Sequence, residues 1–229
     1  FVQDHLVLAG MQGGILRTDD DGRNWRAMLF PPPAPLVTTM VASPNFAEDG
    51  VFVVGTAEDG IFCSIDRGLH WAAWNFGLLD LSVFSIAMSP NFKDDETVFA
   101  GTETGVFRST NGGRSWRAVP FPPEAAPVIS LMVSINGRPY VGTERHGLFY
   151  SADDGQSWER RGATAIPDVV NAILPQFPDH PENVMLLLDT KILTSHDGGQ
   201  TWSLWADIGQ PATAIAAAAQ TMLVGPLEG

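Results

Sequence analysis

The chain has 229 residues, of which 45% are hydrophobic and 17% charged, a balance typical of globular rather than disordered proteins. Its formal net charge of −13 argues against nucleic-acid partners and against docking on anionic lipid, because both draw on clustered lysine and arginine. Cys63 is the only cysteine, so no disulfide can form within the chain. No apolar run reaches the ~18 residues that a membrane span needs, and we expect no membrane insertion.

One segment of eight residues recurs along the chain. It reads Ser-Ala-Asp-Asp-Gly-Gln-Ser-Trp at residues 151–158, and related segments occupy residues 18–25, 64–71, 109–116 and 195–202. The segments end at Trp25, Trp71, Trp116, Trp158 and Trp202, so successive tryptophans are 46, 45, 42 and 44 positions apart. A fixed period of this length is typical of blades, solenoid turns or other repeat arrays.

Each repeat contains the same succession of short runs. The first is an apolar run, at residues 39–42, 85–88, 129–133, 171–174 and 213–217. A polar loop follows it. A β-branched and aromatic run that ends in Gly-Thr follows, at residues 51–56, 98–102 and 140–143. After a turn that contains glycine, a third run leads into the eight-residue segment, at residues 61–62, 106–107, 148–149 and 192–193. A fourth run begins at the tryptophan. Such runs between Gly, Pro, Asn and Asp predict β-strands, and no stretch has a sustained helical period.

Four strands in about 45 residues predict a β-propeller blade. Ile61 and Phe62 are adjacent in the third run, so they point to opposite faces of the sheet, and both faces must be covered, as stacked blades would do. We therefore predict an all-β fold, a β-propeller of four-stranded antiparallel blades. Five blades in this chain would form a single domain over residues 1–229, with six or seven blades in a longer parent protein.

The two ends match the repeat incompletely. Residues 5–10 align with a second strand, so the first blade lacks its inner strand. Residues 213–217 have the pattern of an inner strand, and residues 221–225 again have that of a second strand. Two interpretations stay open: the segment 212–219 closes the first blade as a C-terminal strand, or the duplicated second strand starts a further blade. The chain begins with Phe1 rather than Met, and we expect it to be processed or taken from a longer protein.

The residue types of the repeated segment fit a structural turn. Its first Ser or Thr and its acid can accept hydrogen bonds from backbone N–H groups, and its glycine suits a positive φ. The tryptophan would bury a large ring between neighbouring sheets and needs a partner for its N–H. The predicted structural residues are Asp20, Asp66, Asn111, Asp153, Asp197, Trp25, Trp71, Trp116, Trp158 and Trp202. A calcium loop is disfavoured, because the position twelve in from Asp19 is Phe30 rather than a glutamate.

The pattern Ser-x-Asp-x-Gly-x-Thr-Trp resembles the Asp-box, or bacterial neuraminidase repeat (BNR). That repeat occurs in sialidases, xyloglucanase-type glycoside hydrolases, sortilin-type receptors and a photosystem II assembly factor. The resemblance implies a propeller but no particular activity, since the family spans enzymes, receptors and assembly factors. It also implies that the boxes lie on the face away from the functional site. Because the family is mostly exported, we expect a bacterial protein that is secreted or periplasmic.

Catalytic motifs are few. A sialidase would need an arginine triad and a tyrosine nucleophile, but the Phe-Arg-Ile-Pro motif is absent and the only tyrosines, Tyr140 and Tyr150, fall in strand positions. A glycosidase would need two carboxylates across a cleft. The turns and connections opposite the boxes contain many acids, which could equally be solvated surface charges. They are Glu58, Asp59, Asp80, Glu103, Glu124, Glu144, Asp168, Asp189 and Asp207.

The histidines lack metal-ligand spacing, so we predict no metal and no cofactor.

Aromatic residues in the connections between blades give the best candidate for a binding site. They are interleaved with prolines and could stack on sugar rings or hold a peptide, although packing between blades is the competing interpretation. With the turn at residues 144–146, the candidate ligand-binding residues are Trp74, Phe76, Phe121, Glu144, Arg145, His146 and Trp205. We predict a non-catalytic, monomeric propeller that binds a protein, peptide or glycan through the loop face opposite the boxes. The alternative is a glycoside hydrolase, xyloglucanase-like rather than a sialidase, or part of one.

Overall fold

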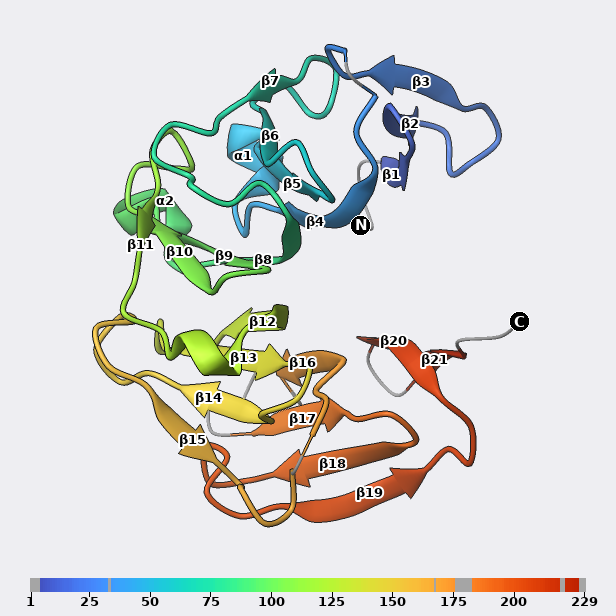
Figure 1. The fold of residues 1–229 in the computed structure, drawn as a ribbon. Coiled ribbons are helices and arrows are strands. Elements are labelled where there is room, and N and C mark those ends of the chain that lie inside the picture. The colour runs from blue at the N-terminus through green and yellow to red at the C-terminus, as the bar shows by residue number, and fades with distance from the viewer. Residues whose placement is uncertain (1–4, 33, 167, 176–182, 219–220, 227–229) are drawn as a thin grey trace. The chain divides into compact units, whose positions relative to one another are not determined.

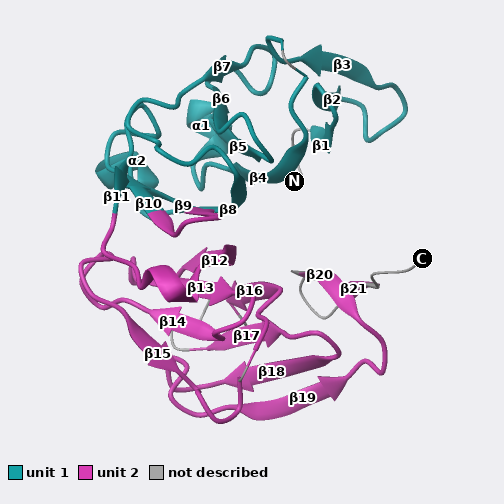
Figure 2. Ribbon diagram, viewed as in Figure 1, with its two compact units in different colours: residues 1–100, 107–118 teal, residues 101–106, 119–229 magenta. Residues whose placement is uncertain are grey.

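The computed structural model describes residues 5–32, 34–166, 168–175, 183–218 and 221–226. The chain divides into two compact units, one of residues 1–100 and 107–118 and the other of residues 101–106 and 119–229 (Figure 2). The described residues form six antiparallel sheets of two to four strands, labelled in Figure 1. The predicted all-β fold is confirmed.

The first unit contains three consecutive sheets. A three-stranded sheet has the order β1-β2-β3, and among the described residues no strand of this sheet precedes β1. Two four-stranded sheets follow, each with its strands in chain order, and the β9–β10 turn of the second sheet belongs to the other unit. The strands are β1 (Val7–Met11), β2 (Gly14–Thr18), β3 (Arg26–Leu29), β4 (Val37–Ala42), β5 (Phe52–Thr56), β6 (Ile61–Ser64), β7 (Ala72–Ala73), β8 (Val83–Met88), β9 (Val98–Thr102), β10 (Val106–Ser109) and β11 (Arg117–Ala118).

The second unit contains two more four-stranded sheets and a final pair of strands. Within it, β12 lies beside β16, and β16 lies beside β20, so the first strands of successive sheets are neighbours. The strands are β12 (Val128–Val133), β13 (Pro139–Thr143), β14 (Leu148–Tyr150), β15 (Glu159–Arg161), β16 (Ala172–Pro175), β17 (Val184–Leu187), β18 (Lys191–Ser195), β19 (Ser203–Asp207), β20 (Ala212–Ala218) and β21 (Thr221–Pro226). A 3-10 turn, η1 (Pro123–Ala125), precedes β12.

The core lies between the sheets, as predicted from the adjacent apolar residues in the third strands. Ile61 and Phe62 are both buried, and they belong to different hydrophobic clusters on opposite faces of β6. Phe62 stacks on Phe30 with ring centroids 4.5 Å apart, whereas Ile61 packs in the cluster that contains Trp116. The sheet β4–β7 is therefore covered on both sides, which its nearly unbroken apolar third strand requires.

Two details differ from the sequence expectations. The fourth strands begin after the box tryptophan rather than at it, because that residue still belongs to the turn; the amide of Trp116, for instance, donates to the Phe76 carbonyl at 2.8 Å. The polar loops after β4 and β8 contain short helices, α1 (Phe46–Asp49) and α2 (Phe92–Asp95). In both loops a serine hydroxyl donates to the last helical aspartate at 2.6 Å, from Ser43 to Asp49 and from Ser89 to Asp95.

The predicted closing segment 212–219 corresponds to β20, and residue 219 lies outside the described residues. β20 pairs with β21 in an antiparallel ladder that extends from Ala212↔Pro226 to Ala218↔Thr221. The first and second strands of a further repeat are therefore present. Closure of the first blade by this segment, the single domain and the total number of blades stay predictions.

Candidate binding face

The boxes are structural turns with nearly identical geometry. In all five, the first Ser or Thr accepts a hydrogen bond from the box glycine amide at 2.8–3.1 Å. The acid, or Asn111, accepts one from the amide four residues later at 2.8–2.9 Å. The box glycines have φ between 81° and 93°, as predicted, a conformation in which a side chain would be strained. The local hydrogen bonding of each box is thus satisfied within its own turn.

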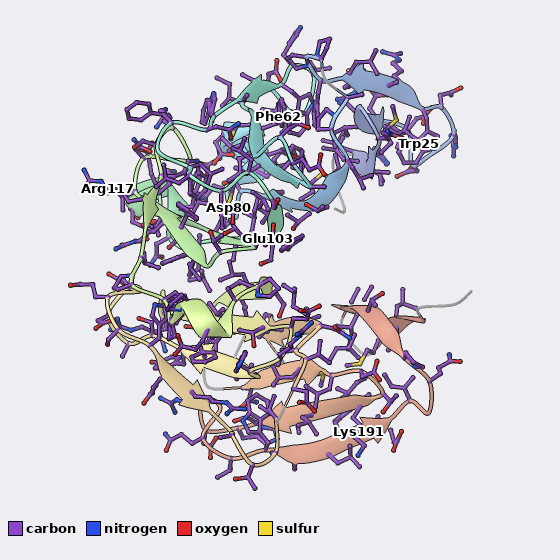
Figure 3. All side chains as sticks on the ribbon, viewed as in Figure 1. Trp25, Phe62, Asp80, Glu103, Arg117 and Lys191 are labelled. Carbon is purple, nitrogen blue, oxygen red and sulfur yellow. The ribbon has the colours of Figure 1, made fainter. Side chains whose placement is uncertain are left out.

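The tryptophans close the boxes in more than one way. Trp25, Trp71 and Trp202 donate their indole N–H to the carbonyl of the box glycine at 2.9–3.1 Å. Trp116 donates instead to the Trp74 carbonyl at 2.9 Å. The indole nitrogen of Trp158 is buried and has no hydrogen-bond partner among the described residues. Trp25, labelled beside β2 and β3 in Figure 3, is 43% exposed, whereas Trp116 is 2% exposed.

Hydrogen bonds hold the box acids in their ionised form. The hydroxyl of Thr18, followed by Asn24, lowers the pKa of Asp20 to about 2, and Ser157 lowers that of Asp153 to about 2. Burial would raise the pKa of Asp66, but bonds from His70 and Ser64 outweigh it and lower the value to about 2. These carboxylates are acceptors already engaged by their own turns, and we assign them no role in chemistry.

Each blade has two distinct ends, and the boxes occupy one of them. At the other end, the connection to the next sheet is bonded to the turn between the second and third strands. Backbone bonds join Ala57 to Leu36, Gly60 to Leu81, Glu144 to Pro127 and Ala212 to Asp189, at 2.9–3.2 Å. The sequence prediction that these turns and connections share the end opposite the boxes is therefore correct in both units.

The connection from β7 to β8 presents apolar side chains to solvent. Phe76 is 80% exposed, Leu79 85% and Leu81 40%, while Leu78 between them is buried. The side chain of Asn75 fixes the start of this connection, because it accepts from the Ile61 amide at 2.7 Å and donates to the Asp59 carbonyl at 3.0 Å.

The sequence analysis selected Phe76 but not Leu79 or Leu81. The signal was available in the run Phe-Gly-Leu-Leu-Asp-Leu at residues 76–81, which is unusually apolar for a loop.

Two other aromatic candidates are packing residues. Phe121 is 8% exposed, and its ring makes edge contacts with Phe149 and Trp158 at centroid distances of 5.2 and 5.3 Å. Trp74 is half-buried against the cluster around Trp116, with the guanidinium of Arg114 5.6 Å from its ring centroid. In this structure neither ring stands free for a ligand.

The remaining candidates are spread over the second unit. Glu144 and Arg145 are exposed in the β13–β14 turn and form an ion pair at 3.3 Å, and His146 beside them is half-buried, with a buried Nδ1 that lacks a partner among the described residues. Trp205 is 50% exposed. It lies within β19 rather than in a connection, as does Asp207, because pairing with β18 extends to Lys191↔Asp207. The corrected position places Trp205 on an outermost strand.

The described residues contain no cluster of three or more His, Cys, Asp or Glu side chains that could hold a metal ion. Nor do they contain a helix long and apolar enough to cross a membrane. Burial raises the pKa of the Cys63 thiol, which is 3% exposed.

Comparisons with known proteins agree with this architecture. The BNR/Asp-box repeat family matches residues 193–204, which include the last box. The chain has a β-propeller fold, and its last box matches the Asp-box repeat. No curated protein matches its sequence.

Three solved structures show the fold. An ancestral GH74 enzyme is 21% identical with a TM-score of 0.61, over 72% of this chain and 23% of that one. YCF48 bound to D1 peptide is 17% identical with a TM-score of 0.68, over 93% of this chain and 68% of that one. The extracellular domain of a putative one-component system from B. thetaiotaomicron is 15% identical with a TM-score of 0.73, over 99% and 31%. The chain thus spans less than a third of the GH74 enzyme and of the sensor domain.

Proposed function

We propose that this Asp-box propeller is a non-catalytic binding protein that takes a protein, peptide or glycan through the loops opposite its boxes. The observation that carries the proposal is the exposure of Phe76, Leu79 and Leu81 on the β7–β8 connection, which is bonded through Leu81 to the β5–β6 turn opposite the box of its sheet. Burying apolar side chains lowers the free energy of a protein in water, so apolar side chains that stay exposed together are typical of interaction surfaces. Aromatic and aliphatic residues often serve as the anchors of such surfaces.

The backbone of this connection is fixed in advance. Asn75 bonds it to the β5–β6 turn at its start, Leu78 anchors it in the core, and the Leu81 carbonyl accepts from Gly60 at 2.9 Å. A partner would therefore dock on a preorganised loop and lose little conformational entropy there. The aliphatic side chains of Leu79 and Leu81 favour an apolar peptide segment over a sugar. The peptide-bound YCF48, which has a similar fold, supports the same choice.

A glycoside hydrolase, or part of one, is the second candidate. It is supported by the similarity to a GH74 enzyme and by acids such as Glu144, which is exposed in the β13–β14 turn, opposite the box of its own sheet. We also propose that the protein is a monomer and acts outside the cytoplasm, where the sensor domain of similar fold is found.

One pair of assays separates the two functions. The purified chain is incubated with xyloglucan and with a sialoside, and released sugar is measured; we expect none. In parallel, random displayed peptides are selected on the same protein, and the affinity of the selected peptides is measured by fluorescence anisotropy; we expect saturable binding. Hydrolysis that is lost in Glu144→Gln or in another loop-carboxylate variant would overturn the binding function.

A further inference from the structure

A small polar hollow in the second unit lies at the box end of its sheets. It is formed between the sheet β12–β15 and the box of the sheet β16–β19, and its volume is about 100 Å³. The residues that matter for its chemistry are Arg138, Tyr140, Tyr150, Arg161, Asp197 and Gln200. A cavity of this size holds a few water molecules or a carboxylate-sized group.

Two acceptors in the wall of this hollow, the Asp197 carboxylate and the Gly198 carbonyl, are already occupied. The carboxylate of Asp197 accepts from the Thr201 amide and hydroxyl at 2.9 and 2.6 Å, from the Ser195 hydroxyl at 2.7 Å and from the Gln200 amide at 3.0 Å. The neighbouring Gly198 carbonyl accepts from the Tyr140 hydroxyl at 3.2 Å. A ligand that must donate hydrogen bonds therefore finds these two acceptors engaged, whereas the side chains of Asn136 and Gln200 can both accept and donate.

The donors come from two arginines. The guanidinium of Arg161 lies over the ring of Tyr150, 4.5 Å from its centroid, and pairs with Glu159. Its Nε is buried and has no hydrogen-bond partner among the described residues. Arg138 donates to the Ala152 carbonyl, and its Nη1 is 3.8 Å from Asp154.

The carboxylates around the hollow leave this donor capacity in place. Glu159 and Asp154 have side chains that are 59% and 49% exposed, so their charges are screened by solvent, and Asp197 is engaged by its own box. The hollow therefore combines two guanidinium groups with one ionised carboxylate, Asp197, whose oxygens already accept hydrogen bonds from its own box.

We propose that this hollow binds a single carboxylate group of a peptide, from either a chain terminus or an acidic side chain. A carboxylate is an acceptor without donors, and its two oxygens match the planar fork of a guanidinium. Arg161, whose Nε lacks an acceptor, is the principal ligand after a small reorientation, and Arg138 is the second. Stacking on Tyr150 holds the Arg161 guanidinium flat against one wall.

The test follows the arginine Nε–H resonances by NMR in the full chain labelled with ¹⁵N-arginine. Three probes are titrated: acetate, a short peptide with a free C-terminus, and a capped peptide with one internal glutamate. We expect a saturable shift of the Arg161 resonance with acetate and with at least one of the peptides. No saturable shift with any of them overturns the proposal.

Variants and competing ligands complete the test. Arg161→Gln is expected to weaken binding at least ~10-fold, the loss typical of a charge-assisted hydrogen bond. Arg161→Lys, which keeps the charge but lacks the fork, should also weaken it, and Arg117→Gln, an exposed arginine on the outermost strand β11, should leave affinity unchanged. Because Arg161→Gln also removes the contact with Tyr150, its fold is checked by the rest of the spectrum, and Arg138→Gln serves as a second loss variant. Equal binding by sulfate or acetamide would overturn the assignment to a carboxylate.

Discussion

Replacing Ser151 by alanine is expected to destabilise the second unit through one lost acceptor. The Ser151 hydroxyl is 1% exposed and accepts from the amides of Gly155 and Asp153 at 2.8 and 3.3 Å, while it donates to the Asp153 carboxylate at 2.8 Å. Gly155 is buried, so in Ser151→Ala its amide has neither a protein acceptor nor water. An unsatisfied buried donor costs about 1–3 kcal/mol.

That loss is large enough to measure. For a chain of this length, each kcal/mol lowers the melting temperature by about 2–4 °C, so Ser151→Ala should melt roughly 2–12 °C below the parent protein in calorimetry. Amide exchange at Gly155 should accelerate in the same variant, because its hydrogen bond is gone.

The same box supplies the control. Ser157 is exposed and donates to the Asp153 carboxylate at 2.6 Å, where water can replace it, so Ser157→Ala should change stability by less than about 0.5 kcal/mol. If Ser151→Ala and Ser157→Ala melt at the same temperature, the buried serine does not stabilise the box in the way described.

Two further predictions concern the boxes. Trp116→Ala should lower the unfolding free energy in urea titrations by about 3–5 kcal/mol, because Trp116 is 2% exposed. Trp25→Ala should lower it by no more than about half of that, because Trp25 is 43% exposed. Equal losses for the two variants would contradict the argument from burial. The pKa values of Asp20 and Asp153 fall from 3.8 to about 2 on folding, so their stabilisation is complete above the unfolded pKa and is lost as pH falls from about 4 through 2. Asp153→Asn, which introduces the residue found in the third box, should make the urea unfolding midpoint depend less on pH over this range. If its midpoint varies with pH as in the parent protein, the hydrogen-bonded Asp153 carboxylate does not contribute to the acid sensitivity.

The fold was predictable because each repeat carries its own turn chemistry. The box glycines, the Gly-Thr endings and the paired apolar residues such as Ile61 and Phe62 fix strand boundaries locally, and the structure confirms them. The helices α1 and α2 were not predictable from periodicity, since each has only four residues, barely one helical turn.

The site was less predictable, because exposure depends on contacts distant in sequence. Phe76 and Phe121 both follow strand four in their repeats, yet Phe121 is buried by Phe149 and Trp158 while Phe76 faces solvent. Likewise, Arg138 and Arg161 meet the box at Asp197 only through strand pairing and the packing of successive sheets. No local pattern in the sequence indicates that Arg138, Arg161 and Asp197 come together.

The most direct test of the proposed binding face compares two double variants for a peptide selected on the parent protein. Phe76→Ser with Leu79→Ser removes side chains that are 80% and 85% exposed on the β7–β8 connection. Ile65→Ser with Leu69→Ser removes exposed apolar side chains, 64% and 46%, from a box itself. Fluorescence anisotropy should show at least a ~10-fold weaker Kd for the first variant, as expected when two interface anchors are lost, and an unchanged Kd for the second. The opposite pattern, or equal affinities for both, would contradict binding through the loops opposite the boxes.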